Sequence, residues 1–387
     1  MMASRGTMKG EGRGGRRWLS VESDQFLHFD VLRFLSATGI MVFHFRTHFF
    51  AHPASDARLD AISLCVDLFF FISGFIITAF YGKVSGVGGY RRFIRKRLAR
   101  LYPLHALTAL LFVAIGMAHA LRIIPLRQPE QFDFRCLPAN MLLLHAAGIC
   151  HNLSFNPVSW SISAEMILYA IFPLILVLRR AGPLTLLAAT VGVLALIMIA
   201  LNSLSPREWT KWTYDYGVIR ALPSFMLGMF CYEIRARLGK LPHAATLMWG
   251  LVALFCVATA CSAPRPVLLA ILYAVAMAGI AADQQTDASG LVRAIAPLGR
   301  LTYSLYMVHP VVDMTLISFA GMKVLKLTGT ALQVWIGLCF LLTFPLAWLS
   351  FRFVEDPLRV RFSGTPAPRK PPPLIRPVTA GEGVSSL

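Results

Sequence analysis

Charged residues are scarce in this chain of 387 residues: they make up 14% of it, whereas 56% of the residues are hydrophobic. Apolar runs recur from about Phe29 to Val354, which is more than the core of a soluble protein of this length needs. The composition therefore excludes a soluble enzyme and predicts an integral membrane protein.

Acidic residues are scarcer still, because 19 Asp and Glu face 37 Lys and Arg, for a formal net charge of +18. In a protein with many membrane spans, such an excess more commonly sets the orientation than binds nucleic acid, so no nucleic-acid partner is expected. The seven cysteines lack metal-ligand spacing, and most lie in apolar runs, where cysteine packs as a small hydrophobe. No metal is expected.

No small-residue cleavage site follows the first apolar stretch, which argues against a signal peptide. We expect residues 1–25, which are basic and Gly-rich, to form a disordered cytosolic tail, and the Pro-rich residues 361–387 to form another. The membrane domain is expected to cover residues 26–360.

Ten apolar runs are long enough to span a bilayer. They lie near 29–50, 62–81, 101–121, 158–178, 183–203, 217–234, 244–262, 266–282, 300–320 and 330–353. The run at 137–149 is shorter and suits a re-entrant or interfacial helix. The predicted fold is therefore all-α, a polytopic membrane bundle of about ten transmembrane helices plus this short helix.

The distribution of basic residues predicts the orientation. With ten spans and the N-terminus inside, most of the 37 Lys and Arg fall on the cytosolic side, which places both termini in the cytosol. A disulfide between Cys136 and Cys150 on the outer face is conceivable, but a straight helix at 137–149 would hold the two about 20 Å apart, too far to bridge.

The first span carries an ionisable stripe, which is expensive inside a bilayer unless it faces protein or a watery cavity. Arg33 and His44 are three helical turns apart on nearly one face, separated by about 16 Å of rise, and Asp30 precedes Arg33 by one turn. A histidine can take a proton from a hydroxyl near neutral pH, so His44 is a candidate catalytic base.

Other polar residues in the spans are candidates for the same cavity. Glu165 enters its span from the outer side, at the depth expected for His44, and the two would form a base and its carboxylate partner. Asp67 either orients His44 or meets water at a helix end. His309 lies midway along a late span and is expected to line the cavity.

Arg97 and Arg100 lie three residues apart in YRRFIRKRLARLYP, where the chain enters the membrane. Basic residues there serve as positive-inside anchors, and the same pair could hold the phosphates of a cytosolic nucleotide donor such as acetyl-CoA. Ser73 and Gly74 are expected to permit close helix packing, and the closing charges Glu355, Asp356 and Arg359 to be interfacial anchors.

Six stretches in this order resemble the bacterial membrane acyltransferases of acyltransferase family 3, which modify sugars and surface polysaccharides. They are FDVLRFLSATGIMVFHF, VDLFFFISGFIIT, FIRKRLARLYP, WSISAE, LGRLTYSLYMVHP and VEDPLR, within residues 26–360. The resemblance implies that Arg33 and His44 serve activity, that Glu165, Arg97 and Arg100 match further polar positions, and that the two arginines lie on the donor side.

The function implied is transfer of an acyl group, commonly acetyl, from cytosolic acyl-CoA to a hydroxyl of a sugar. The acceptor would be an exopolysaccharide, lipopolysaccharide or Nod-factor saccharide, and the expected location is the bacterial inner membrane. Membrane lipids and a polysaccharide biosynthesis complex are the other expected partners. Direct transfer and an acyl-enzyme relay both remain open.

Two other classes of protein carry polar residues in membrane spans. A transporter or flippase for a saccharide or lipid-linked sugar would also place charges along a substrate path, although no second copy of the Arg33–His44 stripe occurs in the later half. A catalytically silent receptor or scaffold is the third alternative. Thioester consumption that depends on a sugar acceptor would separate the enzyme from both.

Overall fold

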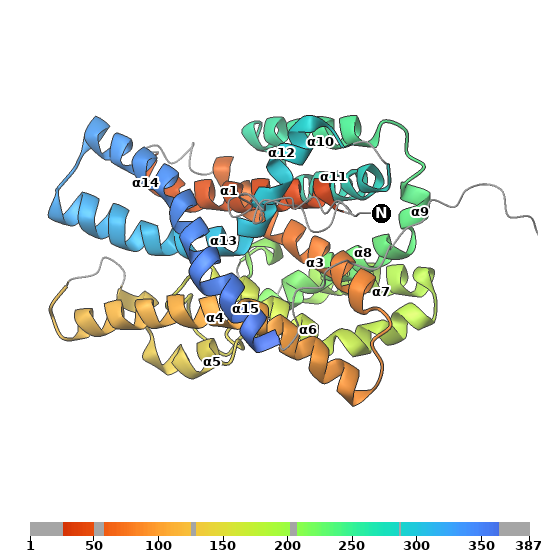
Figure 1. Ribbon diagram of the computed structural model, residues 1–387, viewed down its shortest axis with the longest axis horizontal. Coiled ribbons are helices and arrows are strands. Elements are labelled where there is room, and N and C mark those ends of the chain that lie inside the picture. The colour runs from red at the N-terminus through yellow and green to blue at the C-terminus, as the bar shows by residue number, and fades with distance from the viewer. Residues whose placement is uncertain (1–25, 50–57, 125–128, 202–206, 286–287, 364–387) are drawn as a thin grey trace, which may run out of the picture.

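A computed structural model describes residues 26–49, 58–124, 129–201, 207–285 and 288–363, and within them every regular element is a helix (Figure 1). The predicted tail at 1–25 and most of the one at 361–387 lie outside the described residues. Both tails stay predictions.

The longer helices follow the apolar runs of the sequence. They are α1 (Leu27–Phe49), α3 (Cys65–Tyr81), α4 (Gly86–Ala120), α6 (Ser159–Arg180), α7 (Pro183–Leu196), α8 (Gly217–Glu233), α10 (Ala244–Ala260), α11 (Arg265–Gln284), α13 (Thr302–Val312) and α14 (Gly329–Ser350). The shorter ones are α5 (Leu137–Met141), α9 (Arg235–Leu238), α12 (Gly290–Ile295) and α15 (Asp356–Ser363). Wider π-type turns η8 (Asp313–Val324) and η9 (Phe351–Glu355) extend α13 and α14.

Six helical segments in the described part of the chain are long and apolar enough to cross a membrane. They contain α3, α4, α6, α11, α13 and α14. The other four predicted spans coincide with α1, which carries several charges, and with the shorter helices α7, α8 and α10. The predicted polytopic helix bundle is confirmed, and the chain is a multi-pass membrane protein.

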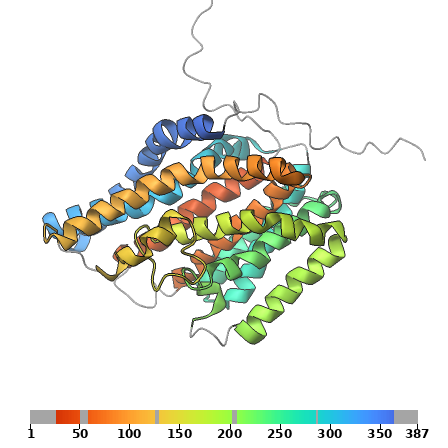
Figure 2. The same ribbon diagram turned by 90° about the horizontal axis from the view of Figure 1, so that it is seen from below.

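Helix α1 lies inside the bundle, in contact with α3, α11, α13 and α14. Figures 1 and 2 show it enclosed by helices from both halves of the chain. Phe29, Val31 and Phe45 are completely buried along its length. The ionisable stripe is mostly covered as well, because the side chains of Arg33 and Asp30 are only 17% and 27% exposed. It therefore faces protein, as the cost of charge in lipid requires.

Helices α3 and α8 approach closely enough for their backbones to touch. A Cβ on Gly74 would lie 2.0 Å from the carbonyl oxygen of Phe225, and one on Gly228 would lie 2.0 Å from that of Phe71. Two glycines facing each other's backbone are the usual device for close packing of membrane helices. The expected packing role of Gly74 agrees with this contact.

The segment between α4 and α6 corrects the prediction for 137–149. Its helix α5 ends at Met141, and the chain then turns through left-handed backbone at Leu143 and Gly148. This turning brings the Cα atoms of Cys136 and Cys150 to 5.6 Å, and the two form a disulfide. The expectation that they could not pair was wrong because it assumed a straight helix.

Candidate active site

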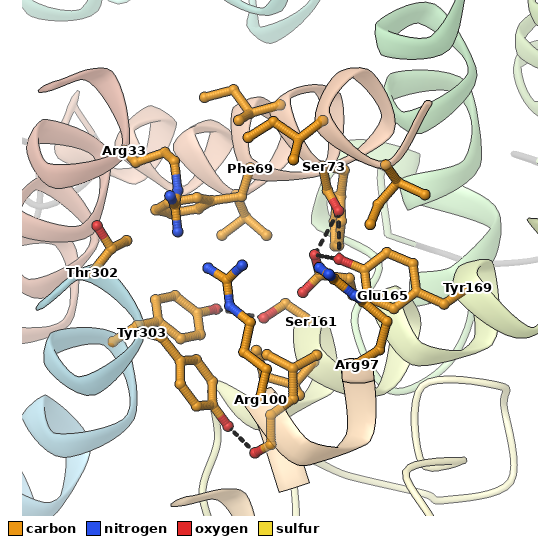
Figure 3. Close-up of a pocket in the computed structure, with 18 residues that line it drawn as sticks. Arg33, Phe69, Ser73, Arg97, Arg100, Ser161, Glu165, Tyr169, Thr302 and Tyr303 are labelled. Atoms are coloured by element: carbon orange, nitrogen blue, oxygen red, sulfur yellow. Dashed lines mark hydrogen bonds between the residues drawn. The ribbon is translucent and has the colours of Figure 1, made fainter. Parts of the chain in front are cut away.

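A pocket opens between α1, α3, α4, α6 and α13, and the arginines of the sequence prediction line it (Figure 3). Arg33 comes from α1, Arg97 and Arg100 from α4, and Glu165 from α6. One wall is apolar, built from residues such as Phe69, Ile72, Ile76 and Ile77 of α3. The pocket thus joins a cluster of cations to an apolar surface.

The three arginines of the pocket differ in how they are held. Arg33 donates to the Asp30 carboxylate at 3.2 Å, one helical turn away, as predicted. Arg97 donates to the Tyr81 hydroxyl at 3.0 Å, and its guanidinium lies 4.9 Å from the centre of that ring. Arg100 makes no hydrogen bond or ion pair to any residue that the structure describes, and its guanidinium points into the pocket (Figure 3).

Glu165 is held by two hydroxyl groups. Ser73 donates to its Oε1 at 2.6 Å, and Tyr169, one turn further along α6, donates to the same oxygen. The hydroxyls of Ser73 and Tyr169 also lie 2.7 Å apart. This network fixes the carboxylate beside the arginines, and the sequence did not predict the part that Ser73 plays in it.

His44 lies further along α1, half-buried, against His309 of α13. The two imidazole ring centres are 5.1 Å apart. His309 is fully buried, its Nδ1–H donates to the Leu305 carbonyl at 3.2 Å, and its Nε2 meets no partner among the described residues. The structure therefore pairs two histidines where the sequence predicted a histidine and a glutamate.

The expected contact between His44 and Glu165 is absent from the described part of the chain, where Glu165 bonds to Ser73 and Tyr169. The reason lies in the loop before α6. The Asn156 side chain donates to the Met307 carbonyl, and Ser163 donates to the Leu143 carbonyl, so this loop folds into the bundle. Helix α6 therefore begins inside the bundle, next to buried backbone. Because the prediction counted residues from the start of the helix, it placed Glu165 at the wrong depth.

Asp67 belongs to a different site. Its carboxylate accepts from Arg220 of α8 at 2.6 Å and 3.2 Å, and both side chains are almost completely buried. The expectation that Asp67 either meets water or orients His44 was wrong. Arg220 follows Asp67 by 153 residues, and no local pattern indicates such a partner.

Glu355 also departs from its predicted role. It is only 5% exposed, and Ser304 of α13 donates to its Oε2 at 2.7 Å. The interfacial-anchor prediction was wrong for this residue, because the π-type turn η9 directs it into the bundle. The neighbouring Asp356 and Arg359 do form an ion pair with each other about one third exposed.

Tyr306 links the two groups of candidate residues. It lines the pocket, and its ring centre lies 5.9 Å from that of His309, which in turn neighbours His44. Tyr306 thus contacts both groups, but neither His44 nor His309 lines the pocket itself. Across the described ranges, no group of three or more His, Cys, Asp or Glu side chains could hold a metal ion.

The chain belongs to acyltransferase family 3, whose acyltransferase-domain model matches residues 26–352. A further relative is described as "Protein 2 in picA locus" of Rhizobium radiobacter. It is 29% identical over 192 residues, which cover 46% of this chain and 93% of that protein. No solved structure matches the chain. The protein is therefore a membrane acyltransferase.

Proposed function

We propose that this acyltransferase moves an acyl group, most simply acetyl, from cytosolic acyl-CoA to a hydroxyl of a surface saccharide. The observation that carries the proposal is the unbonded guanidinium of Arg100, which faces a pocket shared with Arg33 and Arg97. Guanidinium groups bind phosphate by charge-assisted hydrogen bonds, and the donor carries several phosphates.

The distance from the arginines to His44 fits such a donor. Arg33 and His44 are separated by about 16 Å along α1, and CoA has a long pantetheine arm between its phosphates and its thioester. The apolar wall of α3 and Tyr306 line the pocket, and the Tyr306 ring centre lies 5.9 Å from that of His309, so the proposal has the arm pass this ring toward the histidines. In this proposal the arginines hold phosphates at one end and His44 acts at the other.

His44 takes the proton of the acceptor hydroxyl as that oxygen attacks the thioester carbon. The carbon–sulfur bond breaks, an ester bond forms, and the proton ends on the sulfur of CoA. His309 keeps the imidazole of His44 in place by packing against it. Glu165, with the hydroxyls of Ser73 and Tyr169, maintains the shape of the pocket beside the arginines.

The orientation proposed is that of the bacterial inner membrane with both termini in the cytosol. The Cys136–Cys150 disulfide supports it, because disulfides persist in oxidising compartments and this segment lies outside in the predicted topology. The excess of Lys and Arg on the opposite side supports the same orientation. The donor then reaches the arginines from the cytosol.

The first test compares the purified wild type with His44→Ala in transfer of labelled acetyl from acetyl-CoA to isolated surface glycan. Loss of a general base lowers such rates about 10²- to 10⁴-fold, so we expect near-complete loss of transfer while donor binding is retained. His151→Ala is the matched control, because His151 is exposed on the outer segment.

Equal transfer by wild type and His44→Ala would remove His44 from the chemistry. If the folded wild type binds no acetyl-CoA and transfers nothing, the donor assignment fails. Release of labelled glycan across vesicles without thioester consumption would favour the transporter class instead.

A further inference from the structure

Two further ionisable side chains, His48 and Asp313, lie at the end of the histidine pair that points away from the arginines. His48 follows His44 by four residues on α1, and Asp313 follows His309 by four residues, where α13 passes into η8. Residues four apart on a helix share one face and are separated by about 6 Å of rise. The two helices therefore present ionisable groups to each other at two successive levels.

Contacts join the two helices at both levels. At the first level, the ring centres of His44 and His309 lie 5.1 Å apart. At the second level, the Nε2–H of His48 donates to Oδ1 of Asp313 at 2.7 Å. The backbone N–H of Asp313 also donates to the carbonyl of His309, which fixes Asp313 one turn beyond that ring. Asp313 is thus bonded to both helices that carry the histidine pair.

The Asp313 carboxylate still has hydrogen-bonding capacity. Its Oδ1 is occupied by His48, whereas its Oδ2 accepts no hydrogen bond from any residue that the structure describes. The side chain of Asp313 is 25% exposed and that of His48 is 12% exposed, while His309 is completely buried. A carboxylate oxygen accepts hydrogen bonds, so a ligand that donates from a hydroxyl suits this position.

The proposed reaction brings its two substrates to His44 from opposite ends. The donor phosphates are placed at the arginines, and Arg33 lies about 16 Å from His44 toward the start of α1. His48 lies on the other side of His44, one turn toward the end of α1. Glu165 lines the arginine pocket. A saccharide that approaches His44 from the end away from the arginines therefore meets Asp313.

We infer that Asp313, held in place by His48, binds the acceptor saccharide through its Oδ2, which accepts a hydrogen bond from a hydroxyl next to the one that reacts. This contact turns the reacting hydroxyl toward the imidazole of His44. It also favours saccharides that carry neighbouring hydroxyl groups. The inference rests on the proposed function and adds a binding residue for the acceptor to it.

The test measures kcat and KM with labelled acetyl-CoA and isolated surface glycan, for full-length wild type and Asp313→Ala in detergent. Loss of a hydrogen bond to a carboxylate should raise the KM for glycan about 10- to 100-fold. The kcat and the KM for acetyl-CoA should stay close to those of wild type, because the lost contact contributes to binding of the acceptor alone. Asp133→Ala is the matched control, since it removes another carboxylate paired with a basic residue, Arg135, on the segment predicted to lie outside.

Variants of His48 separate this role from general stabilisation. His48→Gln retains a hydrogen-bond donor for Asp313 and should keep the KM for glycan near that of wild type, whereas His48→Ala should raise it. If Asp313→Ala does not fold, Asp313→Asn, which has the same shape, gives the comparison, with a smaller rise in KM.

The possible outcomes distinguish this inference from the proposed function. An unchanged KM for glycan in folded Asp313→Ala, or an equal rise in Asp133→Ala, would overturn the inference and leave the proposed function intact. A fall in kcat with an unchanged KM for glycan would also overturn it, because Asp313 would then support the chemical step. If wild type transfers no acetyl to the glycan, the proposed function fails and the inference fails with it.

Discussion

Two groups of buried charge in this bundle are built in opposite ways. At the α3–α8 contact, Arg220 donates twice to Asp67 and once each to the carbonyls of Trp212 and Ser63. In the pocket, Arg100 has no bonded partner in the described part of the chain. A saturated pair inside a membrane protein holds helices together, whereas an unsaturated guanidinium beside a pocket is available to a ligand.

The largest expected effect comes from breaking the saturated pair. Asp67→Asn leaves the Arg220 charge buried without a counter-charge, which typically costs about 3–5 kcal/mol. We expect a large loss of thermal stability in detergent, measured by the unfolding midpoint. The fraction of the variant that does fold should bind the donor with an affinity close to that of wild type. Asp356→Asn is the control, because its ion pair with Arg359 is partly exposed and such pairs contribute little. Equal midpoints for the two variants would contradict the structural role.

Arg100→Gln should show the reverse pattern. Hydrogen bonds to charged groups contribute about 1.5–3 kcal/mol, so the dissociation constant for CoA should rise roughly 10- to 100-fold. Stability should stay near that of wild type, because no bond is lost within the described residues. Arg92→Gln, which removes an exposed charge from the same helix, is the control. If it weakens binding as much as Arg100→Gln does, the effect is one of general surface charge.

The smallest effect is expected for Ser73→Ala. Glu165 would keep the hydrogen bond from Tyr169 and lose the one from Ser73, which is worth about 1 kcal/mol. We expect kcat/KM to fall roughly fivefold, with stability nearly unchanged. Ser73→Thr retains a hydroxyl and should restore part of the activity. If Ser73→Ala were as inactive as His44→Ala, Ser73 would have to do more than position Glu165.

The sequence predicts the helices well because a bilayer demands long apolar runs whose backbone groups bond within the same segment. It also predicts that Arg33 faces protein or a watery cavity, since charge among apolar residues is costly, whereas it left Arg97 and Arg100 as either interfacial anchors or phosphate-binding residues. The partners of Asp67 and Glu165 could not be predicted. The first depends on a residue 153 positions away, and the second on how deeply an irregular loop folds into the bundle.

Glu355 illustrates a different limit. Its sequence, VEDPLR, places two carboxylates side by side at the end of an apolar run, and both could meet water there. The turn η9 directs the two side chains differently. Glu355 is buried and accepts a hydrogen bond from Ser304, whereas Asp356 forms an ion pair with Arg359. Helical periodicity of 3.6 residues does not describe a π-type turn, so the direction of the side chain could not be read from spacing.

The length of α4 has a mechanical consequence. Its 35 residues extend about 52 Å, well beyond the roughly 30 Å hydrocarbon core, and ordinary tilting does not absorb the difference. Its first turns, with exposed Arg91, Arg92 and Arg95, must therefore stand among headgroups and water. Arg97 and Arg100 follow where the helix passes into the apolar layer, so their charges remain near the aqueous boundary while their side chains reach the interior of the bundle.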